Sequence, residues 1–389
     1  MRVMHVITRM IVGGAQENTL YNCRDLLREH GDDVLLVTGP ADGPEGDLIE
    51  QGGAGGVEVR VIPSLRRAIR PVDDRRALRD LGRLIADYRP DVVHTHSAKA
   101  GFLGRRAAWS AGVPAIVHTV HGAPFHPYQP LAARQLFRWC ERLAAGWCHH
   151  MISVADAMTD LMVAAGVAGP QRFTTIYSGM DVEPFLAADA QRERVRRSLG
   201  LGDQEVVIGK IARLFHLKGH DDLITAAATV LKSHPNARFL LVGDGILRDR
   251  LGQRLADLGI ADRFLFTGLV PPAEVPGLVA AMDLLVHTSL REGLARALPQ
   301  ALIAGRPVIS YDIDGAREVA IDDQTGFLVP AGDRARLAER IGRLVGDPAG
   351  RQRMGENGRR QFTDRFRHQS MTRQIRELYL RLLDERRVR

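Results

Sequence analysis

Short apolar runs alternate along this chain with longer segments in which apolar residues recur every three or four positions. The short runs predict β-strands, and the longer segments predict amphipathic helices. In the first half we expect strands at residues 3–7, 34–38, 57–61, 92–94, 115–119, 151–154 and 173–176, with helices near 15–30, 74–88, 98–111, 131–145 and 155–165. Strands that alternate with helices are typical of parallel sheets covered by helices.

The same alternation resumes after a polar, charged stretch at 181–204. The second half predicts strands at 206–212, 238–242, 264–266, 284–287, 307–310 and 326–329, with helices at 219–233, 246–258, 294–304 and 333–346. We therefore predict an α/β protein with two Rossmann-like, doubly wound parallel-sheet domains, residues 1–180 and 205–364, joined by a linker at 181–204. The final stretch, 365–389, is basic and amphipathic and predicts a C-terminal helix.

Composition narrows the class of protein. The 389 residues suffice for two domains, and 45% apolar with 25% charged residues is the balance of a soluble globular protein. The longest segment without Asp, Glu, Lys or Arg, 107–133, contains three histidines and four prolines and does not predict a membrane span. Three cysteines are typical of reduced thiols, so we expect a cytoplasmic protein.

Charge is distributed unevenly. Residues 1–59 carry four Arg or Lys against ten Asp or Glu, whereas residues 60–142 carry fifteen against six. The basic region includes seven arginines between Arg66 and Arg83, most of them on a predicted helix. They form either a solvated helix face or a patch that meets a diphosphate-linked acceptor or anionic lipid at the inner face of the cell membrane. Nucleic acid is less favoured, because no recognition motif is present and few aromatic residues accompany the arginines.

Ligands bind open α/β sheets at the carboxyl ends of the strands, and the first candidate site follows the first predicted strand. Gly13 and Gly14 precede a predicted helix there, so the backbone can approach a phosphate closely. The pair does not form the G-x-G-x-x-G pattern of dinucleotide-binding enzymes. A tight strand-to-helix turn is the alternative interpretation.

A second candidate site follows the first strand of the second half. Arg213 and Lys218 flank the start of a predicted helix, and Lys218 is one of only four lysines in the chain. Two cations at a helix N-terminus suit a diphosphate. A surface lysine with a stacking arginine is the alternative. Gly243 and Leu269 lie in turns that follow the next two strands.

A third candidate site lies further along the second half. Glu292 opens the predicted helix 294–304, and Gln300 lies eight positions later on nearly the same face. Two polar side chains two turns apart can hold two parts of one extended ligand. The alternatives are a favourable carboxylate in a first helical turn and an ordinary surface amide.

Taken together, six segments in one order resemble glycosyltransferase family 4. They are Gly13-Gly14-Ala15-Gln16, His94-Thr95-His96, His118-Thr119-Val120-His121-Gly122, Ala212-Arg213-Leu214 with Lys218-Gly219, Val242-Gly243-Asp244-Gly245, and Glu292 to Gln300. The resemblance spans nearly the whole chain and is most specific from Ile208 to Pro330. It implies a retaining enzyme with the GT-B fold, whose two domains face each other across a cleft. The N-terminal domain would bind the acceptor and the C-terminal domain the nucleotide sugar, with the last helix packing back on the N-terminal domain.

The resemblance also implies roles for single residues. Arg213 and Lys218 would hold the diphosphate of the donor and stabilise its departure, and Glu292 would contact the transferring sugar. Gln300 stands where the family usually has a second Glu that binds the ribose hydroxyls. Leu294-Ala295 stands where Phe-Gly often follows the first Glu, so the loop around the sugar is expected to differ.

Four further residues complete the predicted site. His121 matches the family's active-site histidine, and Gly14 its donor-loop glycine. Gly243 and Leu269 join the donor-binding set. No metal site is expected, because Cys140, Cys148, His149 and His150 do not have standard ligand spacing.

The sequence therefore predicts a glycosyltransferase, EC 2.4. It would move a sugar from a nucleoside-diphosphate sugar, UDP- or GDP-linked, to a lipid-linked or polysaccharide precursor of the cell envelope. We expect no cofactor and a metal-independent reaction, as the resemblance implies. The alternatives are a non-catalytic nucleotide-sugar-binding protein and an epimerase on the same fold.

Overall fold

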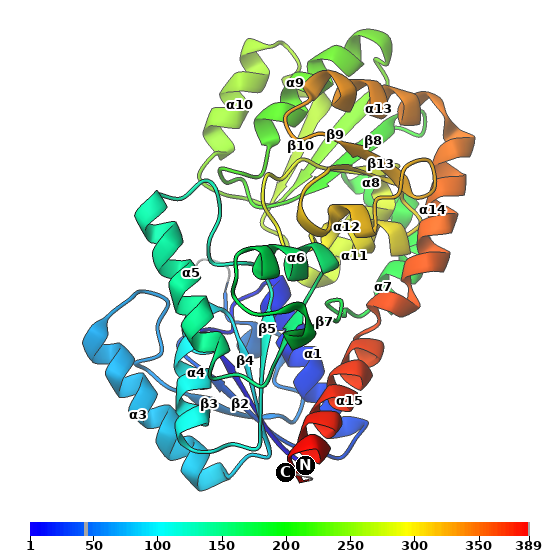
Figure 1. Ribbon diagram of the computed structural model, residues 1–389. Coiled ribbons are helices and arrows are strands. Elements are labelled where there is room, and N and C mark those ends of the chain that lie inside the picture. Colours follow the sequence, from blue (N-terminus) through cyan, green and yellow to red (C-terminus); the bar gives the residue numbers. More distant parts are fainter. Residues whose placement is uncertain (43–45, 388–389) are drawn as a thin grey trace. The chain divides into compact units, whose positions relative to one another are not determined.

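The computed structural model describes residues 1–42 and 46–387, and the chain divides into two compact units (Figure 1). The first unit contains the residues up to Met180 together with those from Arg365 onward, and the second contains Asp181–Asp364. Each unit is built on one parallel sheet with helices against it. The predicted class, two Rossmann-like α/β domains, is confirmed.

The first unit holds a seven-stranded sheet in the order β3-β2-β1-β4-β5-β6-β7. Its strands are β1 (Arg2–Ile7), β2 (Asp33–Thr38), β3 (Glu58–Val61), β4 (Val92–His96), β5 (Ala115–Val120), β6 (His150–Ser153) and β7 (Phe173–Thr175). Its helices are α1 (Gly14–Arg28), α2 (Leu48–Gly52), α3 (Pro71–Tyr88), α4 (Ala98–Ser110), α5 (Leu131–Ala145), α6 (Asp156–Ala164) and α15 (His368–Arg387).

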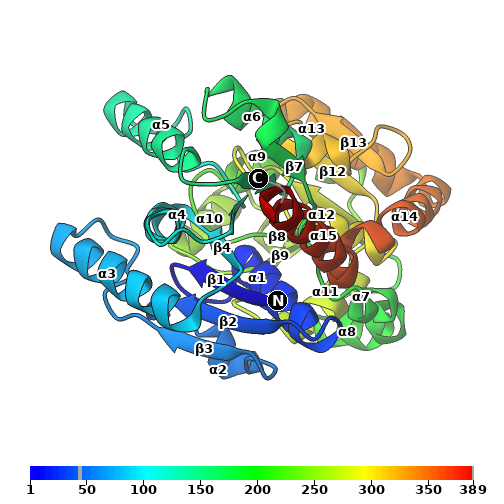
Figure 2. The same ribbon diagram turned by 60° about the horizontal axis from the view of Figure 1, so that its bottom comes forward.

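Both faces of the first sheet are covered. Val3 and Ile7 of β1 pack in one apolar cluster with α1 and α15, whereas Met4 and Val6 pack in another with α3 and α4. Helices α3, α4 and α5 follow one another across the same side, as both ribbon views show (Figures 1 and 2). Strands covered on both faces are apolar at successive positions, which explains the continuous apolar runs in the sequence.

The second unit holds a six-stranded sheet in the order β10-β9-β8-β11-β12-β13. Its strands are β8 (Val206–Ile211), β9 (Ala237–Val242), β10 (Phe264–Gly268), β11 (Leu284–His287), β12 (Val308–Tyr311) and β13 (Gly326–Val329). Its helices are α7 (Glu183–Leu186), α8 (Arg192–Ser198), α9 (His220–Ser233), α10 (Arg248–Asp257), α11 (Val275–Ala281), α12 (Ala297–Ile303), α13 (Arg334–Gly346) and α14 (Pro348–Phe362).

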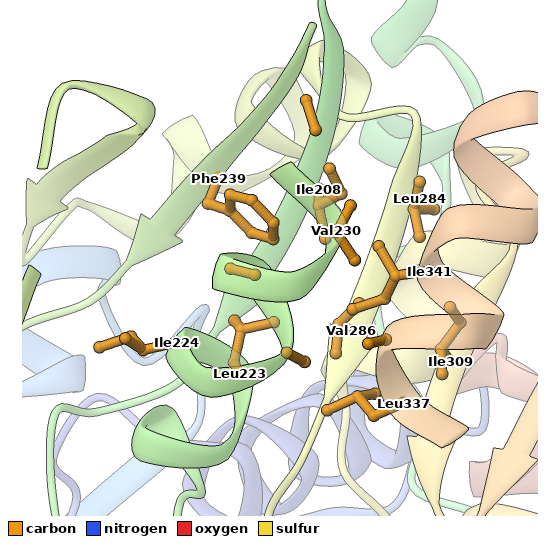
Figure 3. Close-up of a cluster of buried hydrophobic side chains, with 14 of the residues drawn as sticks. Ile208, Leu223, Ile224, Val230, Phe239, Leu284, Val286, Ile309, Leu337 and Ile341 are labelled. Carbon is orange, nitrogen blue, oxygen red and sulfur yellow. The ribbon is translucent and has the colours of Figure 1, made fainter. Parts of the chain in front are cut away.

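Helices α9 and α13 lie against one face of this second sheet. Leu223 and Val230 of α9 meet Leu337 and Ile341 of α13 over a layer of strand side chains that includes Ile208 (Figure 3). All of these side chains are almost completely buried. The layer includes side chains of β8 and β11, and it therefore anchors the two strands whose following loops carry the candidate site.

The predicted strands are all present, but the segment between the domains differs from the prediction. Residues 181–204 carry α7 and α8, and they belong to the second unit. Arg192 and Arg196 explain why, since both guanidinium groups bond to Asp283 and to backbone carbonyls near the end of α11. The C-terminal helix packs with the first unit, as expected, and the last two residues of the predicted range, 388 and 389, lie outside the described residues.

Candidate functional site

The candidate residues of the second unit gather where the strand order reverses. Strands β8 and β11 are neighbours in the sheet although β9 and β10 separate them in the sequence. Arg213 and Lys218 follow β8, and Glu292 follows β11. Open α/β sheets bind ligands in the crevice at such a switch point, outside the carboxyl ends of the strands.

The loop from β8 to α9 is fixed by a glycine. Gly219 precedes α9 with φ of 66°, and a Cβ at this position would lie 1.9 Å from the carbonyl oxygen of Thr288. Only glycine allows so close an approach in this left-handed conformation. Lys218 is therefore held directly before a helix N-terminus, where free N–H groups and the helix dipole favour an anion. Arg213 is exposed, with its guanidinium carbon 5.0 Å from the centre of the Phe215 ring.

Lys218 and Glu292 form an ion pair across the switch point. Lys218 Nζ lies 2.5 Å from Oε1 of Glu292, and His287 Nε2 lies 3.3 Å from the same oxygen. Burial raises the pKa of the Glu292 carboxyl, but His287 and Lys218 more than offset this effect and hold the pKa well below its usual range. Glu292 is therefore an ionised acceptor at neutral pH. The sequence did not indicate the part of His287 in this cluster.

The loop that carries Glu292 differs from the prediction. Helix α12 begins at Ala297, so Glu292 lies before the helix and the argument that placed it on one helical face with Gln300 is wrong. The loop is held instead by Asp314, whose carboxylate accepts the backbone N–H of Glu292 at 2.7 Å. Gln300 lies half-buried in the first turn of α12.

A buried lysine lies beneath this cluster, and we assigned it no role from the sequence. Lys210 of β8 is fully buried, and its ammonium donates to the hydroxyl of Thr288 at 2.9 Å. Burial lowers the pKa of Lys210 to about 7. The available signal was a lysine inside an otherwise apolar strand, in a chain with very few lysines.

The loops after β9 and β10 meet the loop after β8. Gly243 has φ of 130°, a Cβ there would lie 2.4 Å from the carbonyl oxygen of Ala212, and its N–H donates to Gly268 at 3.1 Å. Leu269, the next residue, is 64% exposed. Gly243 thus joins three loops at the same edge of the sheet, beside an exposed apolar side chain.

In the first unit, Gly14 begins α1 after the loop that follows β1. His121 directly follows β5 and is partly exposed. Both residues therefore lie beyond the carboxyl ends of parallel strands, as the fold class requires of ligand-binding residues.

Three further histidines of the first unit are fully buried on the sheet face covered by α1 and α15. His5 of β1 and His96 of β4 are joined through His5 Nδ1 and His96 Nε2 at 3.0 Å, and His96 Nδ1 meets His121 Nε2 at 3.1 Å. His94 meets the Tyr379 hydroxyl of α15 at 2.5 Å and the Thr119 hydroxyl at 2.7 Å. The sequence singled out the His94–His96 segment but not His5, a lone polar residue in an apolar strand.

The buried histidines form a hydrogen-bonded network. His5, His94 and His96 each offer a ring nitrogen within 4.8 Å of the others, close enough to share a metal ion. However, both nitrogens of His94 already bond to hydroxyl groups, and His5 and His96 bond to each other. A metal ion would have to displace these bonds. The contacts therefore favour neutral, hydrogen-bonded rings over ligands.

A cavity of about 360 Å³ lies elsewhere in the second unit. Its lining includes Asp189, Arg306 and Arg359, and both arginines already pair with Asp189. The lining contains none of the predicted site residues. The candidate site is therefore the edge of the sheet rather than this cavity.

Fold and site together define a class of protein. It is an α/β protein with two doubly wound domains, and at the switch point of its second sheet positively charged side chains suit an anionic ligand. Residues 13–179 match the model of the glycosyl transferase 4-like domain, and residues 191–361 match that of glycosyl transferases group 1. The chain belongs to the glycosyltransferases of the GT4 type, with the GT-B fold, and is a glycosyltransferase of class EC 2.4.

Relatives with known names support this assignment. An Escherichia coli protein named UDP-Gal:alpha-D-GlcNAc-diphosphoundecaprenol alpha-1,3-galactosyltransferase is 28% identical over 97% of this chain and 96% of its own. The 2-deoxystreptamine glucosyltransferase of Streptomyces kanamyceticus is 31% identical over 70% of this chain and 73% of its own. The crystal structure of Anabaena Alr3699/HepE in complex with UDP covers 97% of this chain and 99% of its own, with a TM-score of 0.79 and 25% identity.

Within the described part of the chain, each helix is too short or too polar to traverse a bilayer.

Proposed function

We propose that this enzyme transfers a sugar, with retention at the anomeric carbon, from a nucleoside-diphosphate sugar to a lipid-linked or saccharide precursor of the cell envelope. The observation that carries the proposal is the Lys218–Glu292 pair at a helix N-terminus of the second unit. A cation and a carboxylate side by side suit a ligand with a diphosphate at one end and sugar hydroxyls at the other. The named specificities of the relatives support the same donor and acceptor classes.

In this proposal Lys218 binds the diphosphate of the donor while it stays paired with Glu292. An ammonium has three N–H donors, so Lys218 can keep its contact with Glu292 and still donate to a diphosphate oxygen. Glu292, ionised and held by its backbone N–H to Asp314, accepts from a hydroxyl of the transferring sugar. Arg213 adds a second positive charge from the same loop.

The proposed step breaks the bond between the anomeric carbon and the diphosphate oxygen, and the electron pair leaves with the nucleoside diphosphate. The acceptor oxygen forms the new bond on the same face and loses its proton. Negative charge grows on the diphosphate as this bond breaks, and preorganised cations stabilise the transition state more than the ground state. Arg213 and Lys218 supply that charge without a metal ion. His121 and Gly14 of the first unit are proposed to contact the sugar and the donor.

The remaining donor contacts fall to three residues of the second unit. Gln300 accepts from a ribose hydroxyl, Gly243 lets the backbone approach the nucleotide, and Leu269 offers apolar area to the base. An amide acceptor lacks the charge-assisted bond of a carboxylate, at a cost of about 1 kcal/mol.

A product assay tests this proposal. Purified enzyme is incubated with UDP- and GDP-sugars and with a diphospholipid-linked sugar, in the presence and absence of EDTA, and the products are analysed by mass spectrometry and NMR. We expect one added sugar, an anomeric configuration like that of the donor, and equal rates with and without EDTA. An inverted product, or activity that EDTA abolishes, would exclude this mechanism.

We further propose that the first unit contacts an anionic membrane surface from the cytoplasmic side. Leu136, Trp139 and Leu143 of α5 lie three and four residues apart, hence on one face of the helix, and they are 50%, 58% and 38% exposed. Helix α3 lies on the same side of the sheet (Figure 2). It carries four exposed arginines, Arg75, Arg76, Arg79 and Arg83. An apolar stripe with arginines nearby suits acyl chains below anionic headgroups.

A further inference from the structure

A chain of hydrogen bonds runs within the second unit from the buried Lys210 to the start of α9. Nζ of Lys210 donates to the hydroxyl of Thr288 at 2.9 Å, and this hydroxyl donates to the carbonyl oxygen of Gly219 at 2.7 Å. Lys210 belongs to β8, Thr288 directly follows β11, and Gly219 directly precedes α9. The chain therefore joins both strands at the switch point to the helix N-terminus that we propose as the diphosphate site.

The charge on Lys210 gives this chain its direction. An ammonium has N–H donors and no acceptor, so the Thr288 hydroxyl accepts from Lys210 and directs its own proton to Gly219. An uncharged amine has a lone pair, and the hydroxyl proton can then turn to Lys210 and away from the carbonyl of Gly219. The charged form of Lys210 is thus the form that holds Gly219.

Gly219 in turn helps to determine where Lys218 lies. The backbone on both sides of Lys218 is bonded to the segment after β11. Gly219 accepts from Thr288, and the carbonyl of Leu217 accepts from the N–H of Leu290 at 2.8 Å. A displacement of Gly219 would move the Lys218 ammonium and the free N–H groups of α9 together, and these are the groups that suit a diphosphate.

A charged side chain at position 210 lowers the stability of the second unit. Lys210 is fully buried, and burial lowers its pKa to about 7. An apolar side chain of similar length would fill the same space without this cost. The cost favours a role for the ammonium in the site next to it.

We propose that Lys210 is a positioning residue whose ammonium, through the hydroxyl of Thr288, fixes Gly219 and the start of α9 in the conformation that binds the donor diphosphate. This inference rests on the proposed function of the second unit as the donor site. Lys210 is fully buried, so it acts on the donor through Gly219 and Lys218 rather than by contact.

A proton should then enter the protein together with the donor. The ammonium of Lys218 repels the charge on Lys210, whereas Glu292 and Asp222 attract it. A diphosphate at Lys218 offsets the repulsion and adds negative charge, so the pKa of Lys210 rises on binding. Above pH 7 most molecules of the free enzyme lack this proton, and the complex takes it up, so donor affinity must fall as pH rises above 7.

The other titratable side chains that surround Lys210 differ from it in this pH range. They are His220 and Asp222 of α9, His287 of β11, and the Lys218–Glu292 ion pair. Burial lowers the pKa of His220 to about 3 and also lowers the pKa of His287. Proton uptake by either histidine would therefore be largest at low pH, whereas uptake by Lys210 is largest above pH 7.

Calorimetry in buffers of different ionisation enthalpy counts these protons. The probes are UDP-glucose, UDP-galactose and GDP-mannose, because a nucleotide sugar has no group that titrates near pH 7. We expect uptake of about one proton per donor at pH 8 and much less at pH 6, where Lys210 is charged before binding. No uptake at pH 8, or a larger uptake at pH 6, overturns the proposal. If no UDP- or GDP-sugar binds, the proposed donor site is refuted, and this inference with it.

Substitution of the lysine separates positioning from folding. Lys210→Met keeps the length of the side chain and removes its charge. At pH 6 we expect donor affinity to fall about 10-fold, while the melting temperature rises. Weaker binding by a more stable protein does not come from general damage. Lys210→Met should also take up no proton at pH 8, whereas Lys232→Met, at an exposed lysine, should match the wild type. Wild-type affinity in Lys210→Met overturns the proposal.

Substitution of the threonine tests the hydroxyl link. Thr288→Ser keeps the hydroxyl, and Thr288→Val replaces it by a methyl group of similar size. We expect near wild-type donor affinity in Thr288→Ser and a loss of about 10-fold in Thr288→Val. Equal affinities in these two variants overturn the proposal. This pair and the proton count of the unaltered enzyme decide the question even if Lys210→Met does not fold.

Discussion

At the scale of single residues, the second unit places three cations of very different exposure on β8 and in the loop that follows it. Arg213 is exposed, Lys218 is partly covered and Lys210 is fully buried. Only the first two can reach a ligand. The buried lysine instead adds positive potential beneath the site and destabilises the folded unit, because the cost of burying its ammonium outweighs the attraction of Glu292 and Asp222.

Loss of either accessible cation should weaken donor binding and turnover together. We expect Arg213→Ala and Lys218→Ala each to lower kcat/KM, with a rise in activation free energy of about 2–4 kcal/mol. Each substitution removes positive charge that stabilises the departing diphosphate. Steady-state kinetics and calorimetry with the free nucleoside diphosphate measure both effects. Lys232→Ala, at the exposed far end of α9, is the control. If both variants bind the free nucleoside diphosphate with wild-type affinity, these residues do not bind the diphosphate.

Substitutions of Glu292 and Gln300 should affect different kinetic constants. Glu292 is proposed to contact the sugar that reacts, so Glu292→Ala should lower kcat more than it weakens donor binding. Gln300 is proposed to contact the ribose, which does not change during reaction, so Gln300→Ala should raise KM at nearly constant kcat. Gln300→Glu should tighten donor binding slightly. Loss of turnover without loss of donor affinity in Gln300→Ala would place Gln300 in the chemistry instead.

Lys210 predicts a pH dependence of stability. Its pKa is about 7 in the folded unit and near 10.4 in an unfolded chain, so the unfolded chain binds the proton more tightly. Stability must then rise with pH between about 7 and 10, and the full penalty is present below pH 7. Lys210→Met should stabilise the second unit at pH 6, by an amount on the order of 3 kcal/mol, and this gain should shrink at pH 10.

Thermal unfolding followed at several pH values checks this prediction. Lys232→Met, at an exposed lysine, should show no such trend. A stability gain in Lys210→Met that is the same at pH 6 and pH 10 would show that the ammonium is not the source of the penalty.

At the scale of elements, the strands were predictable and several helices were not. Strands covered on both faces must be apolar at successive positions, and this pattern is visible in one sequence. Helix α14 contains Gly350, Gly355 and Gly358, which lower helix propensity. The structure gives the reason: a Cβ at Gly355 would lie 2.0 Å from a carbonyl oxygen of Gly305, next to the end of α12. This close packing of helices is tertiary information that a local pattern does not contain.

The site was predictable in part for the same reason. Its residues follow strands, and chain order places them at the carboxyl edge. By contrast, the contacts that fix Glu292 come from Lys218 and Asp314, which are 74 and 22 residues away. The helix predicted at 294–304 came from the local pattern of apolar residues, but the loop before Ala297 is determined by these distant partners. His5 was missed because one histidine in a strand makes no pattern.

The exposed apolar side chains of α5 (Leu136, Trp139 and Leu143) and the arginines of α3 predict how the protein binds to lipid vesicles. Binding to vesicles should require anionic lipid and fall as salt rises, because exposed charges are screened. Trp139→Ser should weaken binding at all salt concentrations, whereas Arg75→Gln with Arg79→Gln should mainly reduce the salt dependence. Vesicle sedimentation measures both. Tyr128→Ser, at an exposed aromatic residue outside α5, is the control. Equal binding to neutral and anionic vesicles would show that the arginines form only a solvated helix face.

At the scale of the whole molecule, the donor and acceptor are proposed to bind to different units. Transfer then requires the units to come together, and the chain passes between them at Met180–Asp181 and at Asp364–Arg365. We expect small-angle scattering to report a more compact particle with a saturating nucleoside-diphosphate sugar than without it. A Lys218→Ala control at the same donor concentration should compact less, because loss of the ammonium weakens donor binding. Identical curves with and without donor would count against closure.

Those two passages lie next to each other. The N–H of Met180 donates to the carbonyl of Phe366 at 2.8 Å, and the N–H of His368 donates back to Met180 at 3.2 Å. The second unit is therefore one uninterrupted insertion in the first, with both of its ends at a single paired point. The second unit can therefore be exchanged as a whole, because insertion of a domain succeeds where its two ends join the other domain at neighbouring points. Replacing residues 181–364 by the matching segment of a relative should give a chimera that keeps its acceptor and inherits a new donor. Recombination at the two corresponding points of the gene would make the same exchange. Donor preference can then diversify in evolution independently of the rest of the chain.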